Sequence, residues 1–163
     1  MFAAAAAAED GNEVHLFEKN ERLGKKIYIT GKGRCNLTNA CDPEEFFGNV
    51  CSNRKFLYSA FYGCTNQDVI AFFERHGCKT KVERGQRVFP VSDKSADVID
   101  ALRRAMMDAG VQIHLNCEVR ELLTEPSGDK KRACGIRLAD GKTVSGDAVL
   151  VATGGFAYNS GNN

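Results

Sequence analysis

Three stretches of the chain predict helices, by composition or by the spacing of their apolar residues. Residues 2–8 consist of strong helix formers. Residues 44–77 continue a helical pattern, in which Asn66 is a candidate N-cap. Ser95 is a candidate cap for a third helix, which ends at Gly110. The apolar face that places this third helix in the core is formed by Val98, Ile99, Leu102 and Met106.

Shorter apolar segments between the helical stretches have the length of strands. Residues 13–17 and 111–115 each follow a helix directly, and residues 147–152 are continuously apolar, as buried parallel strands are. Residues 79–91 alternate loosely and predict a strand pair, whereas residues 20–43 predict a long loop. Three antiparallel strands are expected at residues 118–123, 133–138 and 142–144. This order indicates an α/β fold with a parallel sheet and an antiparallel three-strand meander.

Composition and charge narrow the class of protein. The 163 residues are 43% apolar and 26% charged, which is ordinary for one globular domain. A net charge of +1 predicts no nucleic-acid or membrane partner. No apolar run reaches the ~18 residues that a membrane-spanning helix needs, and the opening alanines run directly into Glu9 and Asp10, unlike a secretory signal. We therefore expect a cytoplasmic protein.

The pattern of cysteines and histidines indicates structural rather than catalytic or metal-binding roles. No C-x-x-C pair occurs, so we expect reduced thiols and no metal site. Cys35 leaves a lone catalytic thiol open as the alternative. The seven cysteines stand at positions 35, 41, 51, 64, 78, 117 and 134. The histidines at positions 15, 76 and 114 lie in strand or helix patterns and are expected to be structural.

Two expected strands end in residues suited to ligand binding. Ligands of parallel α/β sheets bind at the carboxyl ends of the strands. Glu18 follows the strand at residues 13–17, and Thr153, Gly154 and Gly155 follow the last strand. An acidic residue in the place of Glu18 accepts hydrogen bonds from a ribose diol in dinucleotide-binding folds. By itself, a glutamate at a strand end is also compatible with an ordinary solvated side chain.

The loop at residues 24–39 is a more specific signal. Gly31 and Gly33 allow backbone amides to approach a phosphate, and lysines and Arg34 supply positive charge. Asn36 and its polar neighbours offer short groups for a ribityl chain or a flavin edge. A solvent loop rich in turn-forming residues is the alternative that composition alone supports.

Residues 23–39, read as L-G-K-K-x-x-I-T-G-x-G-R-C-N-L-T-N, resemble the signature of a known family. This is the BaiN/YhiN-like family of NAD(P)/FAD-dependent oxidoreductases, also called aminoacetone-oxidase-like FAD-binding enzymes. The similarity continues through residues 54–61, 82–85, 87–95 and 152–155. It covers essentially the whole chain, although physics assigns no role to the motifs at 87–90 and 92–94.

The resemblance implies a role for specific residues. Glu18 would hold the adenosine ribose, and the segment from Thr30 to Asn36 would line the pyrophosphate and flavin side. Val119 would meet the adenine through its backbone, and residues 152–155 would pass beneath the cofactor. The cofactor-binding residues expected on this basis are Glu18, Lys19, Lys25, Thr30, Gly31, Gly33, Arg34, Cys35, Asn36, Val119, Ala152, Thr153, Gly154 and Gly155.

The resemblance also implies a function. We expect residues 1–163 to be a partial, Rossmann-like FAD/NAD(P)-binding domain with a mainly helical insertion at about residues 40–94. FAD is the expected cofactor, NAD(P)H the expected electron donor, and an unidentified small organic molecule the expected substrate. No residue in the chain is a convincing catalytic acid, base or nucleophile, and the sequence does not determine the oligomeric state.

Family members start with a strand and a G-G-G-x-x-G turn and continue well beyond Gly155, so we expect a fragment truncated at both ends. An open slot is then expected where a central strand would lie between residues 13–17 and 147–152. Two rival functions stay open. One is a truncated or degenerate, non-catalytic chain that does not bind FAD by itself. The other is a flavoprotein acting on RNA, against which the balanced charge argues.

Overall fold

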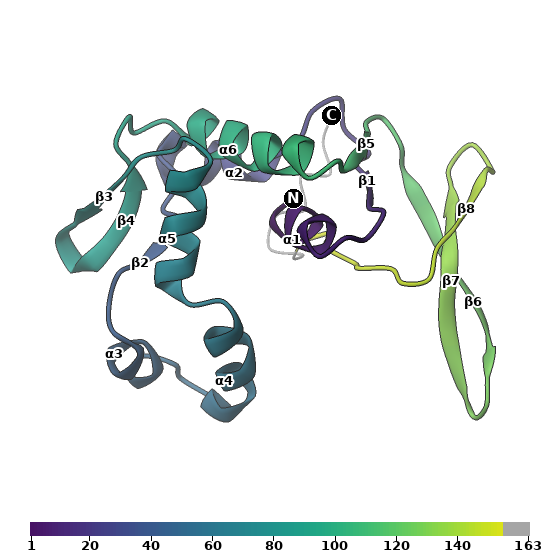
Figure 1. Ribbon diagram of the computed structural model, residues 1–163, viewed down its shortest axis with the longest axis horizontal. Coiled ribbons are helices and arrows are strands. Elements are labelled where there is room, and N and C mark those ends of the chain that lie inside the picture. The colour runs from purple at the N-terminus through teal and green to yellow at the C-terminus, as the bar shows by residue number, and fades with distance from the viewer. Residues whose placement is uncertain (155–163) are drawn as a thin grey trace.

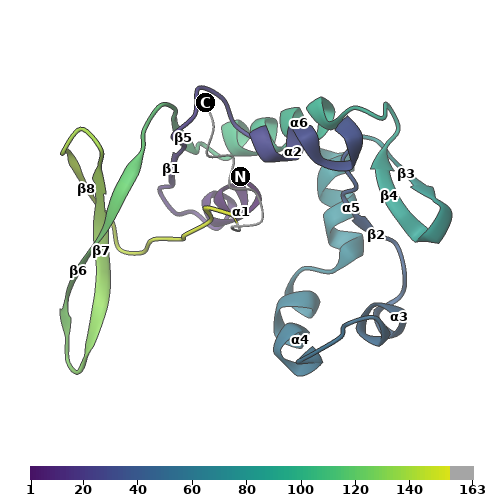
Figure 2. The ribbon, with the colours of Figure 1, turned by 180° about the vertical axis from the view of Figure 1, so that it is seen from behind.

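The computed structural model describes residues 1–154. Figure 1 shows a central group of helices with a small sheet at each end of the molecule. The small antiparallel sheet of β2 (Thr38–Asn39), β3 (Thr80–Glu83) and β4 (Arg87–Pro90) lies at one end. The hairpin of β6 (Val119–Ser127) and β7 (Lys130–Leu138) extends away at the other. Figure 2 shows the same arrangement from behind, with α2 (Lys25–Ile29) alongside α6 (Ser95–Asp108). No helix among residues 1–154 has the length and apolar character to cross a membrane.

A parallel strand pair joins the beginning of the chain to its middle. Helix α1 (Phe2–Glu9) leads into β1 (His15–Phe17), which pairs in parallel with β5 (Gln112–His114). Leu16 stands opposite Ile113 in this register. Both strands and the parallel sheet are as predicted from the sequence. Helix α6 (Ser95–Asp108) precedes β5, and Val98, Leu102 and Met106 of its predicted apolar face are buried, whereas Ile99 is half-buried.

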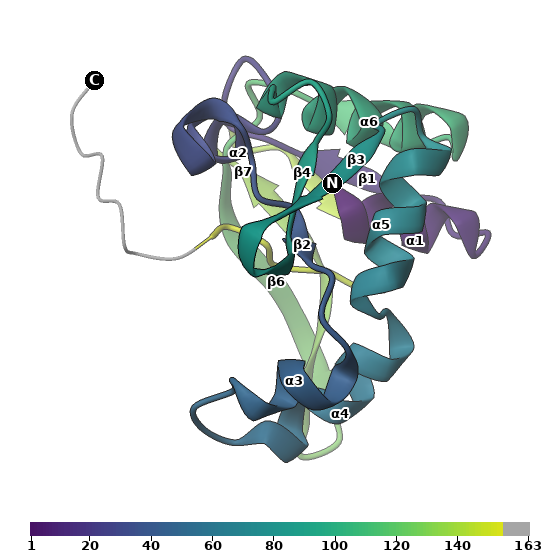
Figure 3. The ribbon, with the colours of Figure 1, turned by 90° about the vertical axis from the view of Figure 1, so that its left-hand side faces the viewer.

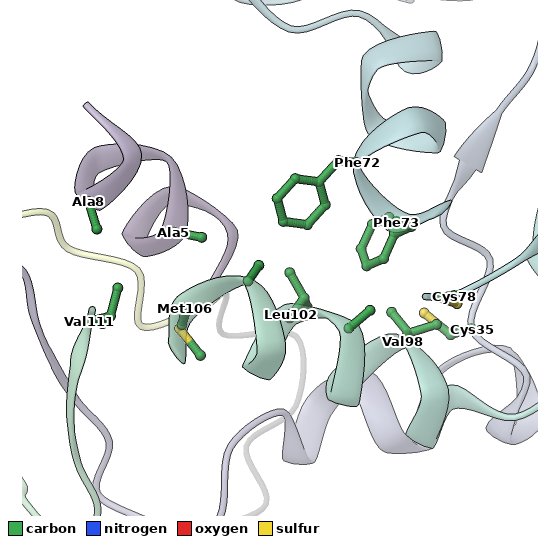
Figure 4. Packing of buried hydrophobic residues seen from close by; sticks show 12 residues of the cluster. Ala5, Ala8, Cys35, Phe72, Phe73, Cys78, Val98, Leu102, Met106 and Val111 are labelled. Carbon is green, nitrogen blue, oxygen red and sulfur yellow. The ribbon is translucent and has the colours of Figure 1, made fainter. Parts of the chain in front are cut away.

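The hydrophobic core lies between α1, α5 (Asn66–Arg75) and α6, as Figure 4 shows. Ala5 on α1 and Met106 on α6 are both completely buried. Alanine has no side chain beyond Cβ, so α1 packs closely on α6. The Phe2 and Phe72 rings, 4.5 Å apart, connect α1 to α5. This core fixes the strands that carry the candidate site.

The expected long loop at residues 20–43 was only partly right. It contains α2 (Lys25–Ile29), the short 3-10 helix η1 (Thr30–Gly33) and β2 (Thr38–Asn39). Ile27 packs against the core cluster, and β2 pairs with β4 (Arg87–Pro90). These long-range contacts stabilise helix and strand where local composition favours a loop.

The helical stretch predicted at residues 44–77 is three separate helices. They are α3 (Pro43–Gly48), α4 (Arg54–Gly63) and α5. In Figure 3, α3 and α4 lie side by side below the sheet that contains β2. The strand pair predicted at residues 79–91 is confirmed as β3 (Thr80–Glu83) and β4, joined by η2 (Arg84–Gln86).

Both candidate helix caps were wrong by one residue. Thr65 caps α5, since its hydroxyl accepts from the Asp68 amide while the Asp68 carboxylate accepts from the Thr65 amide. Asn66 is buried and instead donates to the carbonyls of Asn39 and Cys41. Lys94 is the N-cap of α6, because the Ser95 hydroxyl donates to the Tyr28 carbonyl rather than capping the helix.

The antiparallel meander was predicted correctly. It consists of β6 (Val119–Ser127), β7 (Lys130–Leu138) and β8 (Thr143–Ser145). Leu122 stands opposite Ile136, and Ile136 opposite Val144. Most side chains of β6 are exposed, so the meander extends from the core with little packing on its β6 side.

The buried parallel strand expected at residues 147–152 was wrong. Leu150 is 69% exposed and Val151 is 67% exposed, and no ladder includes these residues. A parallel strand obtains its hydrogen bonds from neighbouring strands, and no strand within residues 1–154 lies alongside this segment. β1 pairs with β5 on one edge and has no strand on its other edge within the described chain. The segment therefore does not form the second wall of the expected slot.

Candidate functional site

Glu18 stands at the carboxyl end of β1 and has one carboxylate oxygen without a donor. Its backbone amide donates to the His114 carbonyl at 2.9 Å, which continues the parallel ladder by one residue. Its Oε1 accepts from the Asn20 amide at 2.9 Å and from the Asn20 side chain at 2.5 Å. Both bonds end on Oε1, and no donor within residues 1–154 reaches Oε2. Oε2 of this half-buried side chain is therefore available to a ligand hydroxyl.

The start of the meander lies directly beside Glu18. The Cys117 amide donates to the Glu18 carbonyl at 2.9 Å, and the Asn116 amide donates to the Asn20 carbonyl at 3.0 Å. Val119 is two residues beyond Cys117 and is 41% exposed. The structure thus places the backbone two residues before Val119 against Glu18, at the ends of the strand pair where ligands of parallel sheets bind.

Basic residues line the path from Glu18 to α2. The Lys25 Nζ donates to the Asn20 side chain at 3.2 Å and to Glu21 at 3.3 Å. Lys19 is exposed on the same turn. Lys26 lies close to the last described residue, because a Cβ on Gly154 would be 2.8 Å from its Nζ.

The predicted site residues that follow the meander lie outside the described strands. Ala152, Thr153 and Gly154 are exposed and belong to no strand. Gly155 lies outside the described residues. Among the described residues, Gly154 connects this segment with the rest of the candidate site through its proximity to Lys26.

We call residues 30–36 the glycine loop, and most of its backbone is left-handed. Gly31, Lys32 and Gly33 have φ values of 54°, 54° and 86°, and Cys35 has a φ of 59°. Non-glycine residues rarely adopt this region. Within the loop, the Arg34 amide donates to the Gly31 carbonyl at 3.1 Å and the Cys35 amide donates to the Thr30 carbonyl at 3.3 Å. These two amides stabilise the turn itself.

The Arg34 side chain is held by two carboxylates and an aromatic ring. Its Nε donates to Asp93 at 2.9 Å, and one terminal nitrogen donates to Asp93 at 2.6 Å and to Glu83 at 2.5 Å. The guanidinium carbon lies 4.3 Å from the centre of the Phe89 ring. Lys81 completes the group, because its Nζ lies 2.7 Å from Asp93 and 3.5 Å from Glu83. We call Arg34, Lys81, Glu83 and Asp93 the charge cluster.

The charge cluster shifts the pKa values of its members in the directions expected for ion pairs. Hydrogen bonds from Lys81 and Arg34 lower the pKa of Asp93, and the bond from Arg34 lowers the pKa of Glu83. Bonds to Glu83 and Asp93 raise the pKa of Arg34. Two positive and two negative charges balance locally, so the guanidinium is not left as an unpaired charge.

The remaining loop residues have structural partners. With its side-chain amide turned to satisfy its neighbours, Asn36 donates to the carbonyls of Val88 and Thr38. The Thr30 hydroxyl donates to the Ile27 carbonyl at 2.7 Å. Cys35 is buried, and burial raises the pKa of its thiol. A raised pKa opposes thiolate formation and supports a structural role over a catalytic thiol.

Hollows on the surface of residues 1–154 include one beside the glycine loop and one over α3 and α4. One of about 220 Å³ lies beside the glycine loop, lined by Tyr28, Gly33, Lys94, Ser95 and Ala96. The other, about 790 Å³, is an open groove over α3 and α4, remote from Glu18. It is lined by Asp42, Pro43, Glu44, Phe47, Gly48, Arg54, Tyr58 and Tyr62. The smaller hollow adjoins the site predicted from the sequence, and the larger one does not.

The predicted residues therefore form two groups joined by α2. Glu18, Lys19, Lys25 and Val119 gather at the end of the parallel strands, and residues 30–36 gather against β4 and the start of α6. Sequence reasoning missed Asn20 as the partner of Glu18. It also missed Glu83, Phe89 and Asp93 as the partners of Arg34. Glu83 lies in the similar segment at 82–85, and Phe89 and Asp93 lie in the motifs at 87–90 and 92–94 whose role was unassigned.

Comparison with known proteins identifies related chains. The chain is 35% identical over 161 residues to the 3-dehydro-bile acid delta(4,6)-reductase of Clostridium scindens. It is 27% identical over 158 residues to the ribosomal RNA dihydrouridine synthase of Escherichia coli and 26% identical over 159 residues to that of Haemophilus influenzae. These alignments include 96–97% of this chain but only 37–38% of each relative. The chain thus spans little more than a third of the length of these relatives.

A solved structure and a family model agree on the fold. The structure of THI4 from Thermovibrio ammonificans superposes with a TM-score of 0.56 at 11% identity, covering 83% of this chain and 42% of that one. At this identity the similarity concerns the fold alone. The family model of the HI0933-like protein Rossmann domain matches residues 1–161. The chain belongs to the HI0933-like Rossmann domain family of BaiN/YhiN-like flavoprotein oxidoreductases, the family that its motifs resemble.

Proposed function

We propose that this chain forms part of the FAD site of a flavoprotein oxidoreductase that takes hydride from NAD(P)H and reduces a small organic molecule. The observation that carries the proposal is the free Oε2 of Glu18 at the carboxyl end of β1, with the backbone before Val119 hydrogen-bonded beside it. A free carboxylate oxygen at this place in a Rossmann-like sheet suits a ribose hydroxyl. The residues present therefore fit an adenosine ribose.

Each end of the site contributes differently to binding. Glu18 accepts a ribose hydroxyl, and the exposed backbone near Val119 contacts the adenine edge. The loop at residues 30–36 and the hollow beside Gly33 lie on the flavin side. FAD, when bound, supplies the two-electron chemistry, whereas this chain's residues bind and orient it.

The cofactor assignment is tested by titration of the full polypeptide that carries this sequence. FAD and FMN differ by the adenosine monophosphate half, which is the part that Glu18 and Val119 are proposed to contact. We expect FAD to bind more tightly than FMN by tenfold or more, a difference of ~1.4 kcal/mol or above. Quenching of flavin fluorescence measures both affinities. Equal affinity for FAD and FMN would remove the adenosine site from the proposal.

The electron donor is tested separately. Anaerobic addition of NADH or NADPH to the flavin-loaded protein should bleach the absorbance of oxidised flavin. Failure of both nucleotides, with the flavin still bound, would overturn the donor assignment and leave the FAD site intact.

The 35% identity to a bile acid reductase supports a small organic substrate. We also propose a cytoplasmic location, which seven unpaired cysteines support.

A second candidate function is flavin-dependent modification of RNA. The observation that favours it is the similarity to two proteins named ribosomal RNA dihydrouridine synthase. The net charge of +1 argues against it, because RNA-binding surfaces are strongly basic. Retention of ribosomal RNA that weakens steeply with salt would support this candidate. If the protein retains no ribosomal RNA at any salt concentration, the small-molecule proposal stands.

A further inference from the structure

The glycine loop keeps a conformation that its own residues disfavour. Lys32 and Cys35 both have left-handed backbones, and the intervening Arg34 has an ordinary right-handed one at φ −90° and ψ −30°. Non-glycine residues hold such a backbone only where the surroundings over-determine it. The question is which contacts of the loop do so.

Arg34 is the residue of the loop with the largest set of distant partners. Its bonds reach Asp93, 59 residues away, and Glu83, 49 residues away. Glu83 belongs to β3, Phe89 to β4, and Asp93 precedes α6. One guanidinium thus connects the loop to two strands and to the beginning of the longest helix.

The geometry of this contact is specific for arginine. Asp93 accepts from both Nε and a terminal nitrogen of Arg34, and the planar group lies over the Phe89 ring. A lysine ammonium lacks the planar fork and stacks less well on a ring. Lys81 contacts the same two carboxylates, at Oδ2 of Asp93 and Oε1 of Glu83, and balances their charge. The cluster therefore leaves little net positive charge for a phosphate.

We propose that Arg34 is a positioning residue, which holds the flavin-side loop in its binding conformation through Asp93, Glu83 and Phe89. This inference rests on the proposed function. It differs from the role that the family resemblance implies for Arg34, which is contact with the pyrophosphate. Under the new assignment, the backbone of the loop meets the cofactor, and the guanidinium determines where that backbone lies.

The decisive variant is Asp93→Asn, made in the full polypeptide. It keeps the positive charge of Arg34 and removes the charge of its principal partner. Asp93 has a φ of 57°, and asparagine tolerates this backbone as well as aspartate does. If Arg34 positions the loop, FAD affinity falls by roughly tenfold, as for loss of one strong interaction. If Arg34 binds phosphate directly, the released guanidinium binds FAD as well as before or better.

Arg34→Lys provides the second comparison. Lysine keeps the charge and loses the fork, so a positioning role predicts a loss of FAD affinity similar to that of Asp93→Asn. A direct phosphate contact predicts near-normal affinity, because lysine is an effective phosphate ligand. Near-normal FAD affinity in both variants would overturn the proposal.

Matched controls come from the meander. Arg132 donates through Nε and a terminal nitrogen to Glu125 at 3.0 and 2.7 Å, the same type of contact on a hairpin away from the loop. Glu125→Gln and Arg132→Lys should leave FAD affinity unchanged. A loss in these controls equal to that in the loop variants would show a general effect of charge and overturn the assignment.

A measurement without cofactor separates this inference from the proposed function. Limited trypsin digestion of the flavin-free protein reports cleavage after Lys32 and position 34. Asp93→Asn should accelerate cleavage there, whereas Glu125→Gln should not. If the unmodified protein binds no FAD but Asp93→Asn opens the loop, the proposed function fails and the loop-holding role of Arg34 stands. Unchanged cleavage overturns that role.

Discussion

The two ends of the candidate site hold their charged residues in different ways. At the parallel strands, Glu18 is bonded by the neutral groups of Asn20 and keeps one oxygen unoccupied. In the glycine loop, Arg34 is bonded by two carboxylates and covered by a ring. A charge in a binding motif is thus open to the ligand at one end and used for structure at the other. The partners of a charged residue, rather than its presence, indicate what it does.

Replacing Glu18 by alanine tests the first half of this comparison and should have the largest effect. Loss of the ribose acceptor costs on the order of 1–3 kcal/mol, or roughly ten- to a hundredfold in FAD affinity. FMN lacks the adenosine, so its affinity should stay the same. Fluorescence titration with both flavins measures the difference.

The matched control is Glu13→Ala, just before β1. Glu13 bonds His15 and Gln112 and lies away from the carboxyl end of the strand. It should affect neither flavin. A Glu18→Ala protein that binds FAD and FMN as the original does would take Glu18 out of the site.

Gly33→Ala tests the loop backbone and should have an intermediate effect. Gly33 has a φ of 86°, and a Cβ there would meet no atom within 4 Å, so the cost is backbone strain alone. A left-handed alanine costs roughly 1–2 kcal/mol. If the free loop of the variant relaxes to escape this strain, FAD binding must restore the left-handed conformation. The affinity for FAD then falls by up to about tenfold.

Gly141→Ala supplies the comparison for that strain. Gly141 has a φ of 88° in the turn before β8 and likewise has no atom within 4 Å of a built Cβ. Thermal unfolding should show a similar destabilisation in both variants, whereas only Gly33→Ala should weaken FAD. Equal FAD affinity in the two variants would exclude the loop backbone from the cofactor site.

The sequence predicted those elements whose signal is local. Helix α6 was evident because its apolar positions repeat at helical spacing over fourteen residues, and the meander because its turns are marked. Helix α2 was missed because five residues carry little periodicity, and its place depends on Ile27 in the core. The strand at 147–152 was predicted from apolarity alone, which does not supply neighbouring strands.

In the candidate site, too, residues with a local sequence signal could be predicted, and residues that depend on distant contacts could not. Glu18 could be proposed because its role follows from a strand that ends directly before it. The partners of Arg34 could not be found in the same way, since contacts across 49 and 59 residues have no local pattern. The sequence does show an acidic residue in two of the segments that resemble the family, Glu83 in 82–85 and Asp93 in 92–94. Whether the other loop residues touch FAD stays a prediction.

The smallest expected effect is a difference in hydrogen exchange between the glycine loop and Glu18 when salt or acid is added. The bonds of the charge cluster are between partly exposed ions, which 1 M salt screens to a Debye length of about 3 Å. The bonds to Glu18 come from neutral donors and depend less on salt. We therefore expect faster hydrogen exchange at high salt for the Arg34, Cys35 and Leu37 amides, which are bonded in or next to the loop. The Glu18 amide, bonded to the His114 carbonyl, should exchange at an unchanged rate.

The pH dependence follows from the lowered pKa values of Asp93 and Glu83. A carboxylate with a lowered folded-state pKa stabilises the native state above its ordinary pKa, and this contribution is lost as the pH falls through the lowered value. Loop protection, corrected for intrinsic exchange, should therefore be constant near neutrality and decrease only below about pH 4. In Asp93→Asn the protection should already be reduced at neutral pH and decrease less in acid. Two results would contradict a loop held by the charge cluster. One is protection that falls in acid equally at the loop and at the Glu18 amide, and the other is protection that falls neither in the original protein nor in Asp93→Asn.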